Sequence, residues 1–215
     1  MIKKKAIFFI LFIFFLRFLH SQQNNFYWEN EFSLESGNIG KFEVINNNQL
    51  IGLLFAKNEK TKQIFFRYSL DGIKWNQKIL LENDFYSNNP NGVDFSGAID
   101  FDNNLYICYR TEQNKIEIEK FYFDSNFSKK EKIFESQSEN VIYLPTLYAT
   151  RNQEICFIFL ENTNKDVKVR FKKIDKDGKI VVENTIADNF KSPLNPYLTE
   201  FNGILYVVFQ EKINR

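Results

Sequence analysis

The sequence predicts an all-β protein built from a repeated, four-stranded unit. Aromatic residues make up 17% of its 215 residues, including 25 Phe and 10 Tyr. Such side chains favour the pleated surface of a strand. Apolar stretches of strand length recur at a nearly constant interval, with polar turns between them. No stretch after the N-terminal segment combines a helical period with capping residues at its ends.

One apolar strand marks the repeat. It is preceded by a polar turn, is followed by a polar exit, and occurs at residues 48–56, 104–110, 152–161 and 202–211. The aromatic residues near the strand ends are Phe55, Tyr109, Phe159 and Phe209, so the spacings are 54, 50 and 50 residues. A constant interval of this length is the sequence sign of a repeat architecture.

Further strands are expected at the same interval as these four. One is expected before each of them, at residues 42–45, 96–100, 144–149 and 195–200. Another is expected after the first three, at residues 63–69, 115–123 and 167–174. Stretches such as 78–81 and 179–182 would be the fourth, outer strand. Four strands in about 50 residues make the blade of a β-propeller, whereas a two-sheet sandwich has no reason to repeat at a fixed length.

The repeat predicts about four blades, near residues 40–90, 91–140, 141–190 and 191–215. The last unit stops soon after its second strand, which leaves two interpretations open. Residues 25–34 could supply an outer strand and close a small four-bladed ring. Alternatively, the chain is a fragment of a larger propeller, whose open edges are prone to aggregation. The second is favoured because residues 212–215 carry no capping strand.

Residues 1–21 are predicted to be a secretory signal peptide. Lys3 to Lys5 form a basic start, residues 6–16 are an unbroken apolar stretch, and cleavage is expected near Ser21. The apolar stretch is short for a membrane span, and no other span is expected. The alternative is an uncleaved N-terminal anchor. In both cases residues 22–215 leave the cytoplasm, for the periplasm, the cell surface or the medium.

Composition excludes several kinds of function. The 28 basic and 27 acidic residues nearly cancel, so no nucleic-acid partner is expected. The single histidine, His20, lies in the signal segment, which removes histidine-based triads and histidine-ligated zinc from the mature chain. No calcium-loop spacing is present, so neither a metal nor a cofactor is expected. Cys108 and Cys156 lie in successive repeats and are expected to be buried free thiols rather than a disulfide.

The sharpest local motif is Tyr-Ser-Leu-Asp-Gly-Ile-Lys-Trp at residues 68–75, between the third and fourth strands of the first blade. The Asp71 carboxylate is expected to accept backbone N–H groups and Gly72 to take a positive φ. Trp75 would then fold back over the turn that begins at Ser69. Residues 175–179 contain a weaker copy, with Asp177 in the place of Asp71.

This motif resembles the Asp-box of the sialidase-type (BNR-repeat) β-propellers, of general form Ser-x-Asp-x-Gly-x-x-Trp, and is one residue shorter. The resemblance implies a structural role for Ser69, Asp71, Gly72 and Trp75. In that family an arginine triad holds the substrate carboxylate, a Tyr–Glu pair is the nucleophile and an Asp is the acid/base. Here Glu43 stands where the first arginine is expected, and the loop at 57–62 contains no Asp. No residue therefore inherits a catalytic role.

The motif also resembles one found in five-bladed glycosidases that act on arabinose, xylose or fructose polymers. Those enzymes use carboxylates at the starts of blades, where this chain has Asp94, Asp100 and Glu200. The plainer interpretation of these three residues is that they are turn residues or solvated strand ends. Similarly, the lysine-rich stretch at residues 129–132 is expected to be a solvated loop.

Five residues near the expected central channel are candidates for ligand binding. Arg110, Glu161 and Glu211 follow the second strands of three blades, while Tyr148 and Tyr197 lie on inner strands. Charged groups in a ring could bind a polar ligand, and aromatic rings stack on sugars. The alternative is that the charged residues pair with one another or face water.

Three functions remain open from the sequence. The favoured one is an exported, non-catalytic propeller that binds a glycan or a cell-surface protein. The second is a glycoside hydrolase of exo-sialidase type, and the third is an inactive fragment of such an enzyme. The motif supports the hydrolase, and the missing arginine and aspartate oppose it.

Overall fold

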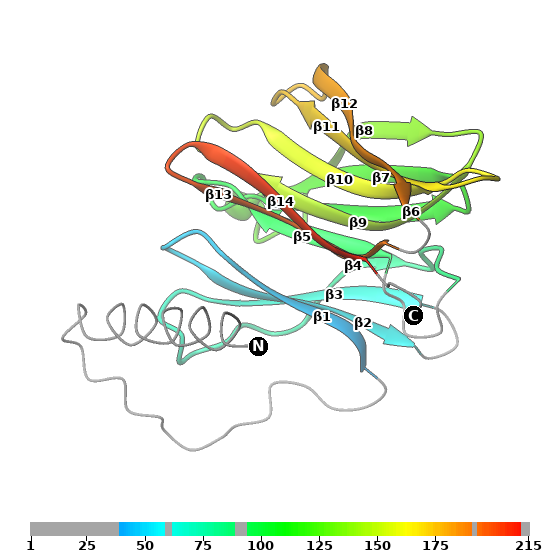
Figure 1. Ribbon diagram of the computed structural model, residues 1–215. Coiled ribbons are helices and arrows are strands. Elements are labelled where there is room, and N and C mark those ends of the chain that lie inside the picture. The colour runs from blue at the N-terminus through cyan, green and yellow to red at the C-terminus, as the bar shows by residue number, and fades with distance from the viewer. Residues whose placement is uncertain (1–38, 59–61, 89–93, 191–192, 212–215) are drawn as a thin grey trace, which may run out of the picture. The chain divides into compact units, whose positions relative to one another are not determined.

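The computed structural model describes residues 39–58, 62–88, 94–190 and 193–211. They form fourteen β-strands and one short 3₁₀ helix, arranged in four antiparallel sheets (Figure 1). The expected signal segment and the expected closing strand at 25–34 lie outside the described residues. Across the part of the chain that is described, no helix has the length and apolar character to cross a membrane.

Each sheet is a meander in which consecutive strands are hydrogen-bonded neighbours. We call the sheets blades 1 to 4. Blade 1 consists of β1 (Ile39–Asn46), β2 (Ile51–Asn58), β3 (Lys62–Ser69) and β4 (Ile79–Asn83). Blade 2 consists of β5 (Phe95–Ile99), β6 (Leu105–Glu112), β7 (Lys115–Phe121) and β8 (Lys130–Gln137), with η1 (Phe123–Ser125) before β8. Blade 3 consists of β9 (Val141–Ala149), β10 (Ile155–Asn162), β11 (Val167–Ile174) and β12 (Ile180–Phe190). Blade 4 has two described strands, β13 (Pro193–Phe201) and β14 (Ile204–Glu211).

The predicted all-β fold of repeated sheets is confirmed, with three four-stranded sheets and a two-stranded fourth. One local prediction is wrong: the lysine-rich stretch expected to be a loop is the start of the outer strand β8. Its Lys130 and Lys132 side chains are exposed at the edge of the sheet, where Lys130 pairs with Glu82 of β4 and Glu119 of β7. Outer strands bury little surface, so their sequences lack the apolar run that identifies a buried strand.

The second strand of each blade is apolar on both faces, because a blade packs against a neighbour on each side. Successive side chains of a strand point to opposite faces. We call the face toward the next blade the forward face and the face toward the preceding blade the rear face. Leu54, Cys108 and Ile158 lie on forward faces, and Ile107, Phe157 and Val207 lie on rear faces.

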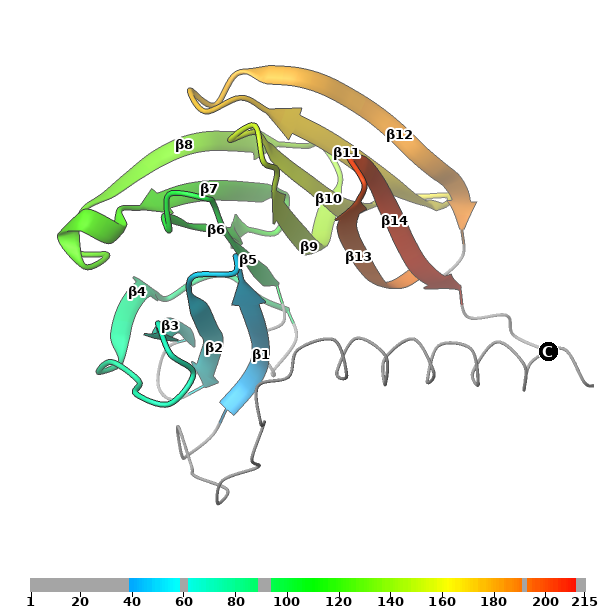
Figure 2. The ribbon, with the colours of Figure 1, turned by 90° about the vertical axis from the view of Figure 1, so that its left-hand side faces the viewer.

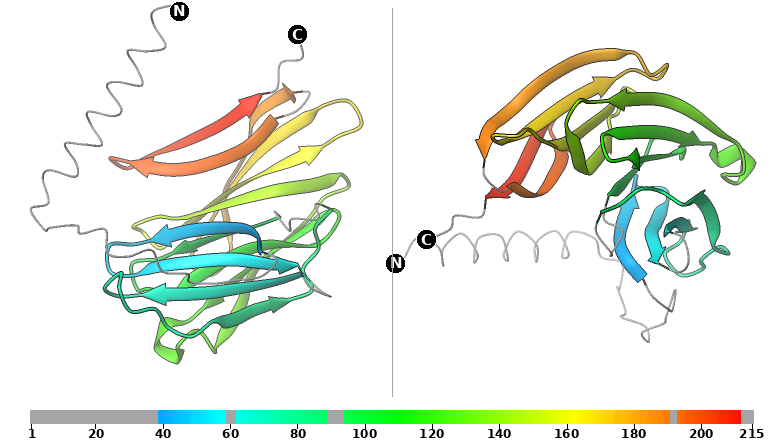
Figure 3. Two further views of the ribbon diagram at one scale, coloured as in Figure 1. Left: turned by 90° about the horizontal axis from the view of Figure 1, so that it is seen from below. Right: turned by 90° about the vertical axis from the view of Figure 1, so that its right-hand side faces the viewer.

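The four blades follow one another in chain order (Figure 2 and Figure 3), and a layer of buried side chains lies between each blade and the next. Between blades 1 and 2, Leu54 and Phe66 pack with Ile107. Between blades 2 and 3, Cys108 and Ile118 pack with Phe157. Between blades 3 and 4, Cys156 and Ile158 pack with Leu198, and Leu205 and Val207 complete the layer. The forward face of one blade is therefore always matched by the rear face of the next.

The first strands of successive blades are linked by single side-chain hydrogen bonds. Glu43 of β1 accepts a hydrogen bond from the Gly97 amide of β5, with Oε2 2.9 Å from N. The Leu147 amide of β9 donates to Ser96 Oγ of β5 at 3.1 Å. Thr146 Oγ1 of β9 donates to the Pro196 carbonyl of β13 at 2.8 Å. These bonds fix the height of each blade relative to its neighbour, which apolar packing alone does not specify.

Cys108 and Cys156 are both buried and free, as predicted. They lie on the forward faces of β6 and β10, in successive core layers. Burial raises the pKa of the Cys156 thiol to about 12 and also raises that of Cys108. Both side chains therefore act as small apolar core residues.

We predict that Gly178→Ala is strongly destabilising. Gly178 lies in the β11–β12 turn with a φ of +81°, and a Cβ there would overlap the Ile133 carbonyl of β8. We expect the free energy of unfolding to fall by about 3 kcal/mol or more, through backbone strain and the overlap together. Urea unfolding followed by circular dichroism measures this loss.

Gly203→Ala is the matched control for this variant. Gly203 has a similar φ of +77°, and nothing lies within 4 Å of the position its Cβ would take. Only strain is added there, so the expected loss is about 1–2 kcal/mol. Equal losses in the two variants would show that the contact with β8 contributes nothing.

Candidate functional site

The antiparallel order of the strands gives every blade two different ends. At one end lie the connections between second and third strands and the segments that join one blade to the next. We call this the loop end. At the other end lie the connections between first and second and between third and fourth strands, which we call the turn end. Polar side chains gather at the loop end, where consecutive blades meet.

Arg110 and Asp94 form a buried ion pair at the loop end of blade 2. Arg110 is 1% exposed and Asp94 is 3% exposed. Arg110 Nη1 lies 3.1 Å from Asp94 Oδ2, and Nη2 donates to the Gln113 carbonyl at 2.7 Å. Asp94 Oδ1 accepts a hydrogen bond from the Leu144 amide of β9 at 3.1 Å. The pair therefore ties blade 2 to blade 3, and neither charged group is open to a ligand.

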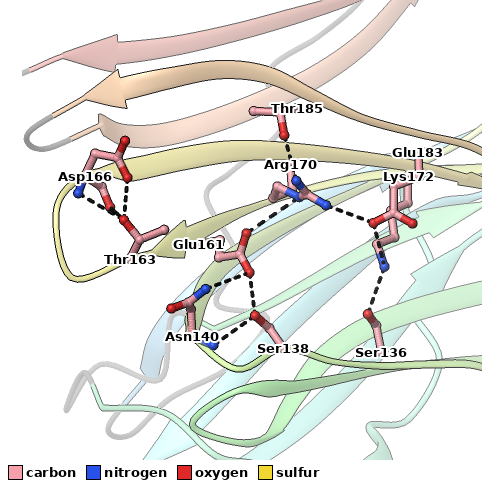
Figure 4. Close-up of polar contacts among 10 residues, drawn as sticks. All are labelled: Ser136, Ser138, Asn140, Glu161, Thr163, Asp166, Arg170, Lys172, Glu183 and Thr185. Carbon is pink, nitrogen blue, oxygen red and sulfur yellow. Dashed lines mark hydrogen bonds and ion pairs between the residues drawn. The ribbon is translucent and has the colours of Figure 1, made fainter.

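A second polar cluster lies at the junction of blades 2 and 3, around Glu161 at the end of β10 (Figure 4). Glu161 Oε1 accepts hydrogen bonds from Ser138 Oγ and, at 3.4 Å, from Asn140 Nδ2. The other oxygen, Oε2, lies 3.7 Å from Arg170 Nε of β11. Within the same view, Thr163 and Asp166 close the neighbouring β10–β11 loop through their side chains.

The cluster continues outward along blade 3 as a row of alternating charges. Arg170 Nη2 lies 3.0 Å from Glu183 Oε1 of β12, and Nη1 donates to Thr185 Oγ1 at 2.6 Å. Lys172 Nζ lies 3.3 Å from Glu183 Oε1 and 3.0 Å from Ser136 Oγ of β8. We call the residues of this row and its hydroxyl and amide partners the Glu161 network: Ser136, Ser138, Asn140, Glu161, Arg170, Lys172, Glu183 and Thr185.

The Glu161 network is fixed on its inner side and open on its outer side. The exposed fraction of the side chain rises from 14% at Glu161 to 26% at Arg170 and 37% at Glu183. Each carboxylate in the row faces a cation, so the row carries no excess charge. A surface of planar donors and acceptors with restricted side chains is suited to hydrogen bonding with a neutral polar ligand.

The structure does not bring the predicted ring of charged residues together. Arg110 occupies the strand position of Leu160, one residue before that of Glu161, so it points to the forward face and Glu161 to the rear face. One residue of offset reverses the face of a strand. Glu211 is the last residue of β14, and its side chain lies outside the described residues.

Tyr148 and Tyr197 lie on forward faces of successive blades rather than around one pocket. Tyr148 is half-buried and packs in the core layer against blade 4. Burial raises the pKa of its phenol, and the nearby Glu200 carboxylate adds to this effect. Tyr197 is 61% exposed, on the open forward face of blade 4. Sequence reasoning identified the inner strands of both residues but could not assign their faces.

The Ser69–Trp75 turn lies at the turn end of blade 1. Asp71 Oδ1 accepts hydrogen bonds from the amides of Lys74 at 2.7 Å and Ile73 at 2.8 Å, and these bonds lower the pKa of its carboxyl. The Gly72 amide donates to Ser69 Oγ at 2.9 Å, and its φ is +75°. An open pocket of about 330 Å³ lies beside the turn, with Tyr68, Leu70, Lys74, Trp75 and Asn76 in its lining.

Two other carboxylates close turns in the same way. In the β11–β12 turn, Asp175 Oδ1 accepts from the amides of Asp177 at 3.0 Å and Lys179 at 2.9 Å. This role belongs to Asp175 and not to Asp177, which the sequence pattern had placed there. Asp100 Oδ1 accepts from the amides of Asp102 at 2.9 Å and Asn104 at 2.8 Å, at the turn end of blade 2. Asp100 thus closes a turn in the structure.

No cluster of His, Cys, Asp or Glu side chains suited to a metal ion occurs in the described ranges. The network itself was not foreseen from the sequence apart from Glu161. Ser138, Asn140 and Arg170 belong to three different segments, and only the packing of blade 2 on blade 3 brings them together.

Comparison with known proteins supports the fold. No family model and no curated protein sequence matches the chain. Among solved structures, a Trypanosoma rangeli sialidase in complex with 2,3-difluoro-KDN superposes with a TM-score of 0.56 at 10% identity, over 83% of this chain and 34% of that one. An exo-β-1,3-galactanase from Phanerochaete chrysosporium superposes with a TM-score of 0.54 at 6% identity, over 83% of this chain and 45% of that one. The chain thus spans less than half of either structure, and at the level of the fold it is a sialidase-like β-propeller.

We predict that the Asp94–Arg110 pair is needed for stability. Arg110→Met leaves the Asp94 carboxylate buried without a cation, and we expect a loss of about 3–5 kcal/mol in the free energy of unfolding. The double variant with Asp94→Asn should lose less than the sum of the two single variants, with a coupling of about 1 kcal/mol or more.

Urea unfolding of the four proteins in this cycle measures the coupling. Lys132→Met is the control, because Lys132 pairs with Glu135 on an exposed strand, and this variant should cost under about 1 kcal/mol. Additive losses at Asp94 and Arg110 would contradict the proposed cross-link.

Proposed function

We propose that this chain is an exported, non-catalytic β-propeller that binds glycans through the Glu161 network. The main support is the partly exposed row of charged side chains from Glu161 through Arg170 to Glu183, which begins at a junction between two blades. The structural neighbours of the chain include proteins named as a sialidase and a galactanase, names that refer to sugars.

The chemistry of the row suits a sugar. Sugar hydroxyls donate and accept hydrogen bonds, and the row offers carboxylate acceptors, guanidinium donors and the Asn140 amide. Hydrogen bonds within the network already restrict the side chains, so less conformational freedom is lost on binding. Tyr148 and Tyr197 would be secondary contacts, since an aromatic ring can stack on a sugar face.

Binding without hydrolysis is favoured because the carboxylates of the candidate residues already pair with groups of the protein. Glycoside hydrolysis needs an acid/base carboxyl group and a nucleophile or activated water on the two sides of the scissile bond. Asp94 is held by Arg110, Asp100 by turn amides, and Glu161 by Ser138, Asn140 and Arg170. The alternative is an exo-sialidase-like hydrolase or an inactive fragment of one, which the Asp-box pattern at residues 69–75 favours.

A glycan-array screen followed by titration calorimetry tests the proposal. For any glycan that binds, Glu161→Gln should weaken binding about tenfold or more, because loss of its charge disturbs both Arg170 and the Ser138 contact. Glu135→Gln is the matched control, since Glu135 pairs with Lys132 on another exposed strand, and it should leave binding unchanged.

Three results would count against this function. They are the absence of binding to any glycan, equal effects of the two substitutions, and release of sugar from a sialylated or pentose-containing substrate. The last would establish the hydrolase instead. If the chain binds no glycan but does bind a cell-surface protein, the ligand class proposed here is wrong.

Export is a separate part of the proposal and rests on residues 1–21. We expect the protein recovered from outside the cytoplasm to begin near residue 22, as its intact mass would show. Recovery of the chain with Met1 in the membrane fraction would instead support the uncleaved anchor.

A further inference from the structure

The loop that joins β7 to β8 contains the triplet Asn126-Phe127-Ser128. Asn-x-Ser/Thr, with any residue except proline in the middle, is the acceptor sequence for N-linked glycosylation of exported proteins. It occurs once in the 215 residues. The loop includes η1 and lies at the turn end of blade 2 (Figure 2). The triplet is therefore placed in a surface connection, as this modification requires.

The second and third residues of the triplet fix the loop to the fold. Phe127 is 2% exposed and packs edge-on against Phe66 and Tyr68 of β3, with ring centroids 5.1 Å and 5.3 Å apart. Ser128 Oγ donates to a carbonyl of the same loop at 2.6 Å. These contacts hold Asn126 at a defined place beside the end of β3.

The side chain of Asn126 is exposed, and its two polar atoms differ in their contacts. Asn126 has a φ of +52°, a conformation that asparagine adopts more readily than most residues. Its Oδ1 accepts a hydrogen bond from the Tyr68 hydroxyl at 2.7 Å. Within the described residues, Nδ2 has no hydrogen-bond partner. An N-linked sugar is joined to Nδ2, so the folded loop can carry one and still keep the contact of Oδ1 with Tyr68.

A suitable surface for a sugar lies next to this asparagine. Tyr68, whose hydroxyl bonds Asn126, also lines the open pocket beside the Ser69–Trp75 turn. Trp75 and Leu70 line the same pocket, and Leu70 is 63% exposed. The apolar face of a sugar ring packs well on such aromatic and aliphatic groups. A sugar joined to Asn126 therefore has both room and an apolar surface within reach.

We propose that Asn126 is glycosylated at Nδ2 when the chain is exported. The proposal rests on the export proposed above, because this modification belongs to exported proteins. The donor is an oligosaccharide joined through its C1 carbon to a lipid pyrophosphate. A bond forms between Nδ2 and C1, the bond from C1 to the pyrophosphate oxygen breaks, and Nδ2 loses one proton as the lipid pyrophosphate leaves. Transfer precedes folding of the loop, since folding buries Phe127 and engages the Ser128 hydroxyl.

The mass of the full chain recovered from outside the cytoplasm of the cells that make it tests this proposal. We expect a mass above that of the sequence by one oligosaccharide, and tandem mass spectrometry should locate the sugar on Asn126. Asn126→Gln and Ser128→Ala should each abolish the added mass. Ser128→Thr should keep it, because threonine also completes the acceptor triplet.

Asn202→Gln is the matched control and should keep the added mass. Asn202 is also exposed and has a φ of +51°, but the residue two positions later is Ile204 and not a serine or threonine. Loss of the added mass in this control as well would overturn the assignment to the triplet. Added mass that survives both Asn126→Gln and Ser128→Ala would place the modification elsewhere and overturn it too.

The failure of export and the failure of glycosylation give different results. An exported chain with only the mass of its sequence would overturn the proposal and leave export intact. A chain that stays in the cytoplasm would refute export, and transfer in vitro then decides the acceptor. For this the unfolded full chain is mixed with a purified oligosaccharyltransferase and a lipid-linked oligosaccharide. Transfer to the unaltered chain but not to Ser128→Ala would support the site, and no transfer would overturn it.

Discussion

The structure depends on burial of both faces of the second strand in each blade. β10 shows this most clearly, because all residues from Ile155 to Leu160 are buried. Ile155, Phe157 and Phe159 face blade 2, whereas Cys156, Ile158 and Leu160 face blade 4. A strand apolar on both faces is unstable in an isolated sheet, since both faces would remain in water. Blades therefore stabilise each other in sequence order, as in other repeat proteins.

Apolar packing holds the blades together but does not determine how far one blade is shifted along its neighbour. Polar groups determine this shift. Glu43, Ser96 and Thr146 each make one hydrogen bond to the backbone of a neighbouring first strand. At the loop end, Asp94 joins the Arg110 guanidinium to the Leu144 amide of the next blade. This explains Glu43, which stands where the resemblance to sialidases led us to expect an arginine. Its carboxylate accepts the Gly97 amide, a bond that no arginine side chain could replace, because guanidinium only donates.

The fold could be predicted from the sequence where burial determines which residue types a strand contains. The Glu161 network could not be predicted in this way. The second strands were identified because a doubly buried strand is a continuous apolar run. Strand β8 was missed because its charged side chains are exposed, with Lys132 paired to Glu117 of β7 and to Glu135 of β8. Glu161 was found as a charge after an apolar strand, but its partners Ser138 and Arg170 depend on the contact of two blades and on strand register. The faces of Arg110 and Tyr197 likewise follow from register, which residue types alone do not determine.

The position of the Glu161 network connects the packing of the blades with ligand binding. Ser138 and Asn140 come from the segment that leaves blade 2, while Glu161 and Arg170 come from blade 3. Such a surface exists only where two blades meet, so it is a property of the junction and not of a single blade.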